Sequence, residues 1–231
     1  IIKLIKTVPQ LIHFTDVNGD TLIHHVIRWN NPELFDLLLK EGANPTIANK
    51  LGEEPLHIAL THNDAQQRLN RLRQAWREQQ NLESRLHPLL LHEAVLFDES
   101  IEEPAKHLFR GQDTFTNYWY DSAKFTPLHL AAALGKKELV QLFCQRLPTD
   151  GLHLKNIHGQ TPLLMAAIHG HQDIIDELFK NCLNLSAKDM SKTIIQSTDN
   201  DDNSILHYLA KYGHEELYQR LLANPQNYPY C

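Results

Sequence analysis

The chain of 231 residues contains few cysteines, no long apolar run and no excess of basic residues. Its three cysteines, Cys144, Cys182 and Cys231, lie far apart and outside any CxxC spacing, which argues against a structural zinc site and a disulfide-rich scaffold. No apolar run approaches the roughly 18 residues that a membrane span needs. The net charge of −6 offers no attraction for nucleic-acid phosphates. We therefore expect a protein of a reducing, cytoplasmic compartment that does not bind nucleic acid.

Motifs of common enzyme classes are also missing from the sequence. The chain contains no GxGxxG or GxxxxGK[ST] phosphate loop, no HExxH zinc helix and no GxSxG nucleophile turn. We therefore expect no catalytic, cofactor-binding or metal-binding residues in this chain and no cofactor. The chain also opens without Met, so we expect it to be a piece of a longer protein.

What the sequence does contain is an internal repeat. The stretch "TPLHLAAALG" from Thr126 is nearly repeated as "TPLLMAAIHG" from Thr161. A Leu-His pair or a close variant of it marks each copy, and the successive spacings are 33, 35, 37, 35 and 43 residues. Such a period predicts a stack of similar units rather than one compact core. The six pairs are Ile23-His24, Leu56-His57, Leu91-His92, Leu128-His129, Leu163-Leu164 and Leu206-His207.

Each copy predicts a tight turn followed by two short helices. Asp or Asn, often with Gly three residues later, favours the turn; Thr caps the first helix and Pro begins it, as in "NIHGQTPLL" from Asn156. The pairs Ala131-Ala132 and Ala166-Ala167 allow neighbouring first helices to pack closely. Stretches such as "ELFDLLL" and "DIIDELF" carry apolar residues on one helical face. One copy cannot bury such a face alone, whereas stacked copies can.

These residues resemble the ankyrin repeat family, whose pattern D-x-x-G-x-T-P-L-H-x-A-A-x-x-G-H-x-E-I-V-x-x-L-L matches residues 16–39, 121–143 and 156–179 closely. The resemblance implies an all-α ankyrin-repeat solenoid of helix-turn-helix units with short β-hairpin turns. We expect about five recognisable repeats and one degenerate repeat or helical insertion. The resemblance also implies that the marker histidines hydrogen-bond a neighbouring turn, and that a partner protein binds the concave groove and the hairpin tips.

The repeat pattern predicts four regions. Residues 1–15 form an N-terminal capping helix, 16–63 the first repeats, 64–115 an Arg-rich helical insertion with a degenerate repeat, and 116–231 the remaining repeats. The last region has an extended hairpin near 183–198 and a C-terminal cap. Two interpretations of the second region stay open: residues 82–115 are a degenerate repeat, or 64–115 is one inserted helical hairpin. We expect arginines such as Arg68 to lie on its solvated face, and Leu69, Leu72 and Trp76 to pack on the solenoid.

Two alternative chemistries are less favoured. Cys144 or Cys182 could act as a nucleophile with a histidine base, but neither lies in a local motif. The pairs His24-His25 and His169-x-His171 could ligate a metal, but no Cys or acidic cluster stands at ligand spacing. We interpret these residues as structural or incidental.

The predicted function is protein–protein interaction by a monomer. The resemblance places partner contacts on the turn tips and on the two residues before the helix-ending glycine. The alternative is that the chain is the targeting or substrate-recruiting domain of a larger enzyme, such as a secreted effector acting in a host cytoplasm. The predicted partner-binding residues are Arg28, Trp29, Lys50, Leu51, His62, Phe125, Leu134, His158, Ile168, His169, Lys211 and Tyr212.

Overall fold

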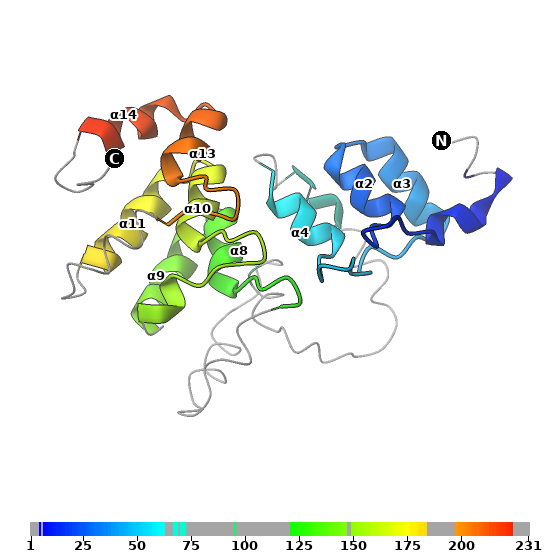
Figure 1. Cartoon of the computed structure of the whole chain (residues 1–231), viewed down its shortest axis with the longest axis horizontal. Helices are drawn as coiled ribbons and strands as arrows, with labels where there is room; N and C mark the ends of the chain where they lie inside the picture. The colour runs from blue at the N-terminus through cyan, green and yellow to red at the C-terminus, as the bar shows by residue number, and fades with distance from the viewer. Residues whose placement is uncertain are drawn as a thin grey trace. The chain divides into compact units, whose positions relative to one another are not determined.

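The protein is represented by a computed structural model that describes residues 5, 7–62, 67–68, 70–72, 95, 121–146, 149–183 and 197–223. The chain divides into two compact units, Ile1–Leu86 and His87–Cys231. Every named element in the described ranges is a helix (Figure 1). This confirms the all-α class, and the number of repeats stays a prediction.

Unit 1 is built around the first described helix pair. Its elements are the 3₁₀ helix η1 (Pro9–His13) and the α-helices α2 (Leu22–Arg28), α3 (Pro32–Lys40) and α4 (Pro55–Leu60). Helix α2 packs against both α3 and α4. Its buried face carries Ile23 and Val26, and α3 contributes Phe35 and Leu38. Within the predicted N-terminal cap at 1–15, the described element is η1.

Unit 2 repeats this arrangement along the chain. It contains α8 (Pro127–Ala133), α9 (Lys137–Arg146), the 3₁₀ helix η2 (Thr149–Leu152), α10 (Pro162–Ile168), α11 (Gln172–Leu183), α13 (Ile205–Lys211) and α14 (Glu215–Ala223). Helix α10 packs between α8 and α13, while each of these first helices packs against its own second helix (Figure 1). The small residues predicted for close packing, Ala131-Ala132 and Ala166-Ala167, are all fully buried.

The turns before the first helices share one hydrogen-bonding pattern. In the turn at Asn156, the backbone N–H of Asn156 donates to the Gln160 carbonyl (3.0 Å), and the Asn156 Oδ1 accepts from the amides of His158 and Gln160. The turns at Asp16, Asn49, Asp121 and Asp199 make the equivalent bonds. The predicted turns are therefore present. Among the described residues, the β-structure of these turns is one antiparallel bridge between Thr15 and Thr21.

Two of the marker histidines, His24 and His129, join their repeat to the next turn. His129 Nδ1 accepts from the Thr126 backbone N–H (3.1 Å), so a neutral ring carries its proton on Nε2, which donates to the Gln160 carbonyl (3.0 Å). His24 makes the same two bonds, to Thr21 and to the Glu53 carbonyl. Both rings are fully buried. These contacts confirm the expected structural role for His24 and His129.

The glycines that end α8 and α10 in unit 2 allow the next repeat to approach. Gly135 and Gly170 have φ of 71° and 69°, in the left-handed region that favours glycine. A Cβ on Gly135 would lie 2.9 Å from the His171 ring, and a Cβ on Gly170 would clash with the His214 ring. These positions therefore require glycine for stacking as well as for the backbone turn.

The predictions for the two irregular segments concern residues that the structure describes only in part. The extended hairpin near 183–198 lies almost entirely outside them, as does most of 64–115, so both interpretations of that region stay open. Within it, Leu72 is buried, as predicted. Arg68, expected on a solvated face, is also buried, and its guanidinium donates to the carbonyls of Ile27 and Arg28. The expectation for Arg68 is wrong, because the end of α2 offers carbonyl groups that need donors.

Candidate partner-binding surface

The column of residues directly before the helix-ending Asn or Gly varies in exposure: Trp29 in unit 1 is exposed, Leu134 in unit 2 is buried, and His62, His169 and Tyr212 are half-buried. Trp29 is 59% exposed, whereas Leu134 is 8% and Ile168 is 0% exposed. Phe125, predicted at a turn tip, is also 0% exposed. The expectation that Phe125, Leu134 and Ile168 are surface anchors is therefore wrong. The stacking of α8, α10 and α13 covers them, so they contribute to the core instead.

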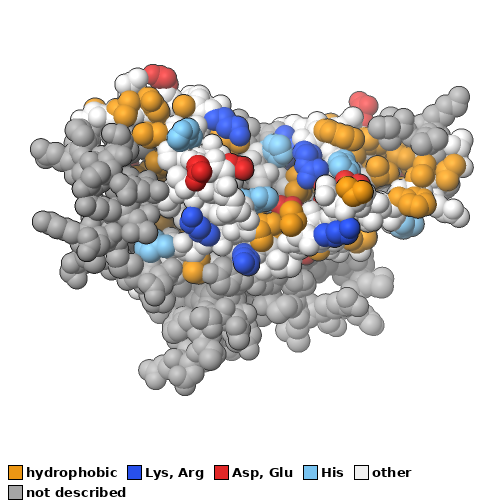
Figure 2. All heavy atoms as spheres, in the orientation of Figure 1, with side chains coloured by type: hydrophobic (Ala, Val, Ile, Leu, Met, Phe, Trp, Pro, Cys, Tyr) orange, Lys and Arg blue, Asp and Glu red, His pale blue; other side chains and the backbone are white. Residues whose placement is uncertain are grey.

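Large exposed apolar side chains concentrate in unit 1. Figure 2 shows hydrophobic side chains gathered over the region of α2 and α3. Of the seven such residues among the described ones, Leu222 lies in unit 2 and the other six in unit 1. Exposed apolar surface that the fold does not bury is typical of an interaction site. The six are Val8, Phe14, Val17, Trp29, Ile47 and Leu51.

The turn tips of unit 1 are held in place by hydrogen bonds. The Lys50 backbone N–H donates to the Asn18 carbonyl (2.9 Å), and the Lys50 Nζ donates to the Val17 carbonyl (2.7 Å). Leu51 lies beside Lys50 at the tip and is 61% exposed. Both predicted residues are therefore on the surface, on a backbone fixed by the neighbouring turn.

A pocket of about 340 Å³ opens in unit 1 between η1, the Asp16 turn and helices α2 and α3. Its walls are mostly apolar, while carboxylate and imidazole groups line one side. The exposed Trp29 indole belongs to the lining and stacks on the His25 ring, with 5.5 Å between ring centroids. The pocket thus joins buried apolar surface to an exposed aromatic ring. Its apolar lining includes Ile5, Leu11, Phe14, Leu22, Val26 and Leu34.

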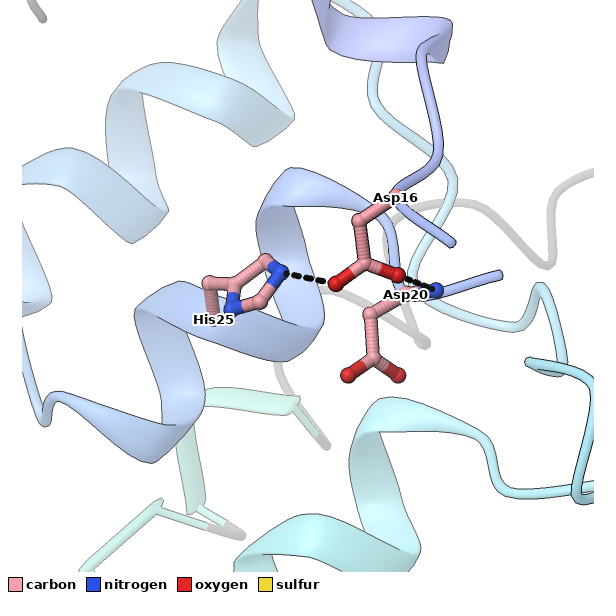
Figure 3. A group of neighbouring side chains, drawn as sticks. All are labelled: Asp16, Asp20 and His25. Atoms are coloured by element: carbon pink, nitrogen blue, oxygen red, sulfur yellow. Dashed lines mark hydrogen bonds and ion pairs between the residues drawn. The ribbon is translucent and has the colours of Figure 1, made fainter. Parts of the chain in front are cut away.

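The polar side of this pocket is formed by Asp16, Asp20 and His25 (Figure 3). Asp16 Oδ1 accepts from the backbone N–H of Asp20 (3.0 Å), and its Oδ2 accepts from His25 Nε2 (3.1 Å). Burial alone would raise the pKa of Asp16, but these bonds together lower it from its usual value. Asp16 is therefore a carboxylate at neutral pH. Its side chain is 34% exposed.

These three side chains are of the kinds that can ligate a metal, and their ligand atoms lie within 4.8 Å of one another. Asp20, however, is already engaged: its Oδ2 accepts two bonds from the Arg28 guanidinium (3.2 Å each), and its Oδ1 accepts from Asn49 (2.8 Å). A cation placed between the three groups would compete with Arg28 for the carboxylate. The geometry therefore favours an ion-pair network, with Arg28 bound to Asp20 at the surface.

The predicted residues of unit 2 that stay accessible are partly occupied by neighbours. The Tyr212 ring is half-buried and stacks on Tyr208 (6.1 Å between centroids, 1° between planes), with the Lys211 Nζ 5.4 Å from its centroid. The His169 ring stacks on His171 at 6.1 Å. His158 is also half-buried, as is His62 in unit 1. These positions present smaller surfaces than Trp29.

A buried polar network in unit 2 was not predicted from the sequence. Asn156 donates to Gln160 (3.1 Å), Gln160 donates to the Tyr208 hydroxyl (3.1 Å), and that hydroxyl donates to Asp199. Burial first, and then the bond to Asp199, raise the pKa of Tyr208 far above its usual value. Burial alone would raise the pKa of Asp199, but the bonds from Tyr208 and Asn203 lower it. The network links two successive turns and has a structural role.

The alternative chemistries gain no support from the described residues. His24 uses both ring nitrogens in the repeat contact, so it cannot ligate a metal together with His25. Cys144 is half-buried on α9, and Cys231 and the side chain of Cys182 lie outside the described part of the chain. None of the described helices is long and apolar enough to cross a membrane.

Family models match the two units separately. A model described as ankyrin repeats in three copies matches residues 91–189, and a model described as ankyrin repeat matches residues 18–50. The first range contains the described helices from α8 to α11, and the second contains α2 and α3. The matched ranges therefore contain three of the described helix pairs, while α4, α13 and α14 lie outside them.

Curated relatives share these repeats over part of their length. XBAT31 of Arabidopsis thaliana, named as a candidate E3 ubiquitin-protein ligase, is 31% identical over 102 residues, which are 44% of this chain and 20% of that protein. The nuclear factor NF-kappa-B p105 subunit of Rattus norvegicus is 29% identical over 147 residues, 62% of this chain and 14% of that protein. Protein glp-1 of Caenorhabditis elegans is 26% identical over 225 residues, 94% and 16% respectively. The chain thus spans a fifth or less of the length of these relatives, and by its repeats it belongs to the ankyrin repeat family.

Proposed function

We propose that this chain is a protein–protein interaction module that binds its partner chiefly through the exposed surface of unit 1. The observation that carries the proposal is the exposure of Trp29, at 59%, in a column whose unit 2 members are buried at Leu134 and half-buried at His169 and Tyr212. A large aromatic ring that the fold leaves exposed to water contributes strongly to the binding free energy when a partner buries it.

The proposed surface is organised before the partner arrives. Stacking on His25 restricts the Trp29 ring, and His25 in turn donates to Asp16. The Lys50 contacts fix the neighbouring tip that carries Leu51. Side chains that are already ordered lose less conformational entropy on binding, which favours affinity. Unit 2 contributes Lys211 and Tyr212 as a second, smaller contact.

The experiment is capture of partners from a cell lysate on the wild-type chain, followed by titration of a recovered protein with Trp29→Ala/Tyr212→Ala. We expect the double variant to raise the Kd about a hundredfold, from about 2 kcal/mol at Trp29 and a smaller loss at Tyr212. The melting temperature should change little, because Trp29 is mostly exposed. Equal affinity of both proteins would exclude these columns as the interface.

A second function is favoured by the relatives. The chain covers a fifth or less of each of them, and one is named as a candidate E3 ubiquitin-protein ligase. We propose that the chain recruits or targets partners for a larger protein, in which any catalytic activity resides elsewhere; a secreted effector in a host cytoplasm is one such protein. Sequencing the complete reading frame tests this, and a frame that ends with the repeats would contradict it. A reducing compartment and a monomeric state remain predictions.

A further inference from the structure

The pocket of unit 1 combines three features that suit one kind of side chain. Its walls, which include Leu11 and Val26, are apolar; the Asp16 carboxylate lies on its polar side; and the exposed Trp29 indole belongs to its lining. The side chains of arginine and lysine have an apolar stem and a cationic end, and they bury the stem while the charge seeks a carboxylate or an aromatic face. We propose that this pocket receives a basic side chain, preferably arginine, from the partner segment of the proposed function.

The charges around the pocket leave one carboxylate for such a cation. Asp20 is paired with the Arg28 guanidinium, and its other oxygen accepts from Asn49. His25 donates to Asp16 from Nε2, while its Nδ1 lies 3.4 Å from the Arg28 Nη1 and faces a donor. Asp16 is the other carboxylate at the pocket, and the hydrogen bonds that lower its pKa keep it ionised at neutral pH.

Arginine fits this arrangement better than lysine. Its planar guanidinium can stack on an indole face while its N–H groups donate to a carboxylate, which an ammonium cannot do with the same geometry. His25 stacks on Trp29, and the indole as a whole is 59% exposed, so a ring surface remains for the incoming side chain. His25 contacts both the carboxylate and the indole.

The test uses a display library of random 12-residue peptides, selected in parallel on wild type, Asp16→Asn and the control Asp121→Asn. The repeat itself shows that asparagine preserves the turn: Asn49 and Asn156 occupy the same turn position and accept the same two amide bonds through Oδ1. Asp121 makes these turn bonds in unit 2, away from the pocket lining. Asp16→Asn and Asp121→Asn therefore remove the same charge from equivalent turns.

Wild type and Asp121→Asn should enrich peptides that place Arg or Lys beside apolar residues, and Asp16→Asn should lose this basic preference. A peptide selected on wild type should bind Asp16→Asn about tenfold more weakly, as expected for a charge-assisted hydrogen bond. Identical selections on wild type and Asp16→Asn would overturn the inference, as would no enrichment or enrichment of acidic or wholly apolar peptides. If such peptides still depend on Trp29, the proposed function stands while the basic-residue inference fails.

Discussion

The two units fasten the ends of their first helices with different residues. In unit 1, Arg68 donates to the carbonyls of Ile27 and Arg28 at the end of α2. In unit 2, His171 Nε2 bonds the Ala133 carbonyl at the end of α8 (3.1 Å), and His214 Nε2 bonds the Ile168 carbonyl at the end of α10 (3.4 Å). Each donor comes from a later part of the same unit. In both units, carbonyl groups at the end of a first helix accept a hydrogen bond from a later side chain. The donor is a guanidinium in unit 1 and an imidazole ring in unit 2.

This difference accompanies a difference in surface. Where His214 packs against Gly170, the neighbouring column residue His169 is half-buried, and Leu134 in the preceding repeat is buried. At the corresponding end of α2 the chain has Asn30 with φ of 51° in place of glycine, and Trp29 beside it is exposed. The column of unit 2 is thus buried at Leu134 and partly covered at His169 and Tyr212, whereas Trp29 in unit 1 stays available for a partner.

The largest effect on stability should come from replacing Gly170 in unit 2 with asparagine, the residue that unit 1 has at the equivalent position, Asn30. Gly170→Asn places a Cβ against the His214 ring, which must move and lose its bond to the Ile168 carbonyl. We expect a loss of about 2–3 kcal/mol in the free energy of unfolding, measured by urea denaturation. Gly213→Asn is the control: its φ is 74°, and nothing lies within 4 Å of a Cβ there. Equal losses in both variants would show that the backbone conformation, and not the stacking contact, sets the requirement.

Replacing Arg68, the cationic donor at the end of α2, should have the next largest effect on stability. Arg68→Ala leaves the Ile27 and Arg28 carbonyls at the end of α2 without this donor, which should cost about 1–3 kcal/mol. Amide hydrogen exchange should accelerate in α2 and stay unchanged in α10. Arg68→Lys keeps one cationic donor and should recover part of the protection. Unchanged exchange in α2 for Arg68→Ala would contradict the assigned role.

Lowering the pH should distinguish the imidazole donors of unit 2 from the guanidinium donor of unit 1. Burial lowers the pKa of His171 below its usual value, although the bond to Ala133 and the charge of Asp173 oppose this and His214 adds to it. As pH falls below about 6.5, the unfolded chain takes up the proton first, so this stabilising contribution is present above that pH and is lost below it.

Burial also lowers the pKa of His24, so both units should lose stability as the pH falls below about 6.5. The loss should be smaller in His171→Gln than in wild type. At the end of α2, where the donor is the Arg68 guanidinium, local exchange protection should follow only the global loss of stability. Denaturant titrations at pH 7, 6 and 5 measure the slope. A wild-type slope that His171→Gln leaves unchanged would contradict the role of this ring.

The smallest effect concerns a turn in which unit 2 departs from the glycine pattern. Lys124 has φ of 58° at the position that glycine occupies in the turns of Gly19, Gly52 and Gly159. Lys124→Gly should relieve the left-handed strain of a side chain, at an entropic cost in the unfolded state, for a net gain of about 0.5 kcal/mol. Calorimetry should show a slightly higher melting temperature. A lower one would mean that the Lys124 side chain stabilises the turn.

The repeat could be predicted because equivalent positions have the same structural role in most copies. The Asp or Asn of the turn, the Thr cap and the marker histidine each make local bonds within a few residues, so their spacing alone identifies them. The next-turn bonds of His24 and His129 followed from the family resemblance. Residues whose role depends on the neighbouring repeat were harder to place.

The errors concern positions decided by packing between repeats. Phe125 was predicted at an exposed tip, yet the same position in other copies, Asp20, Glu53 and Gln160, is buried as well. At this position the structure pairs Asp20 and Glu53 with Asn49, and Gln160 with Tyr208. Arg68 likewise depends on the end of α2, 40 residues away. Periodicity within one helix does not show such contacts.

The most direct test of the account compares one column position in each unit. A recovered partner should be titrated against wild type, Trp29→Ala and Tyr212→Ala, with melting temperatures measured in parallel. Trp29→Ala should raise the Kd about thirtyfold, and Tyr212→Ala should raise it less, because Tyr212 already stacks on Tyr208. An unchanged Kd for Trp29→Ala, or a larger effect of Tyr212→Ala, would contradict the claim that unit 1 carries the main binding surface.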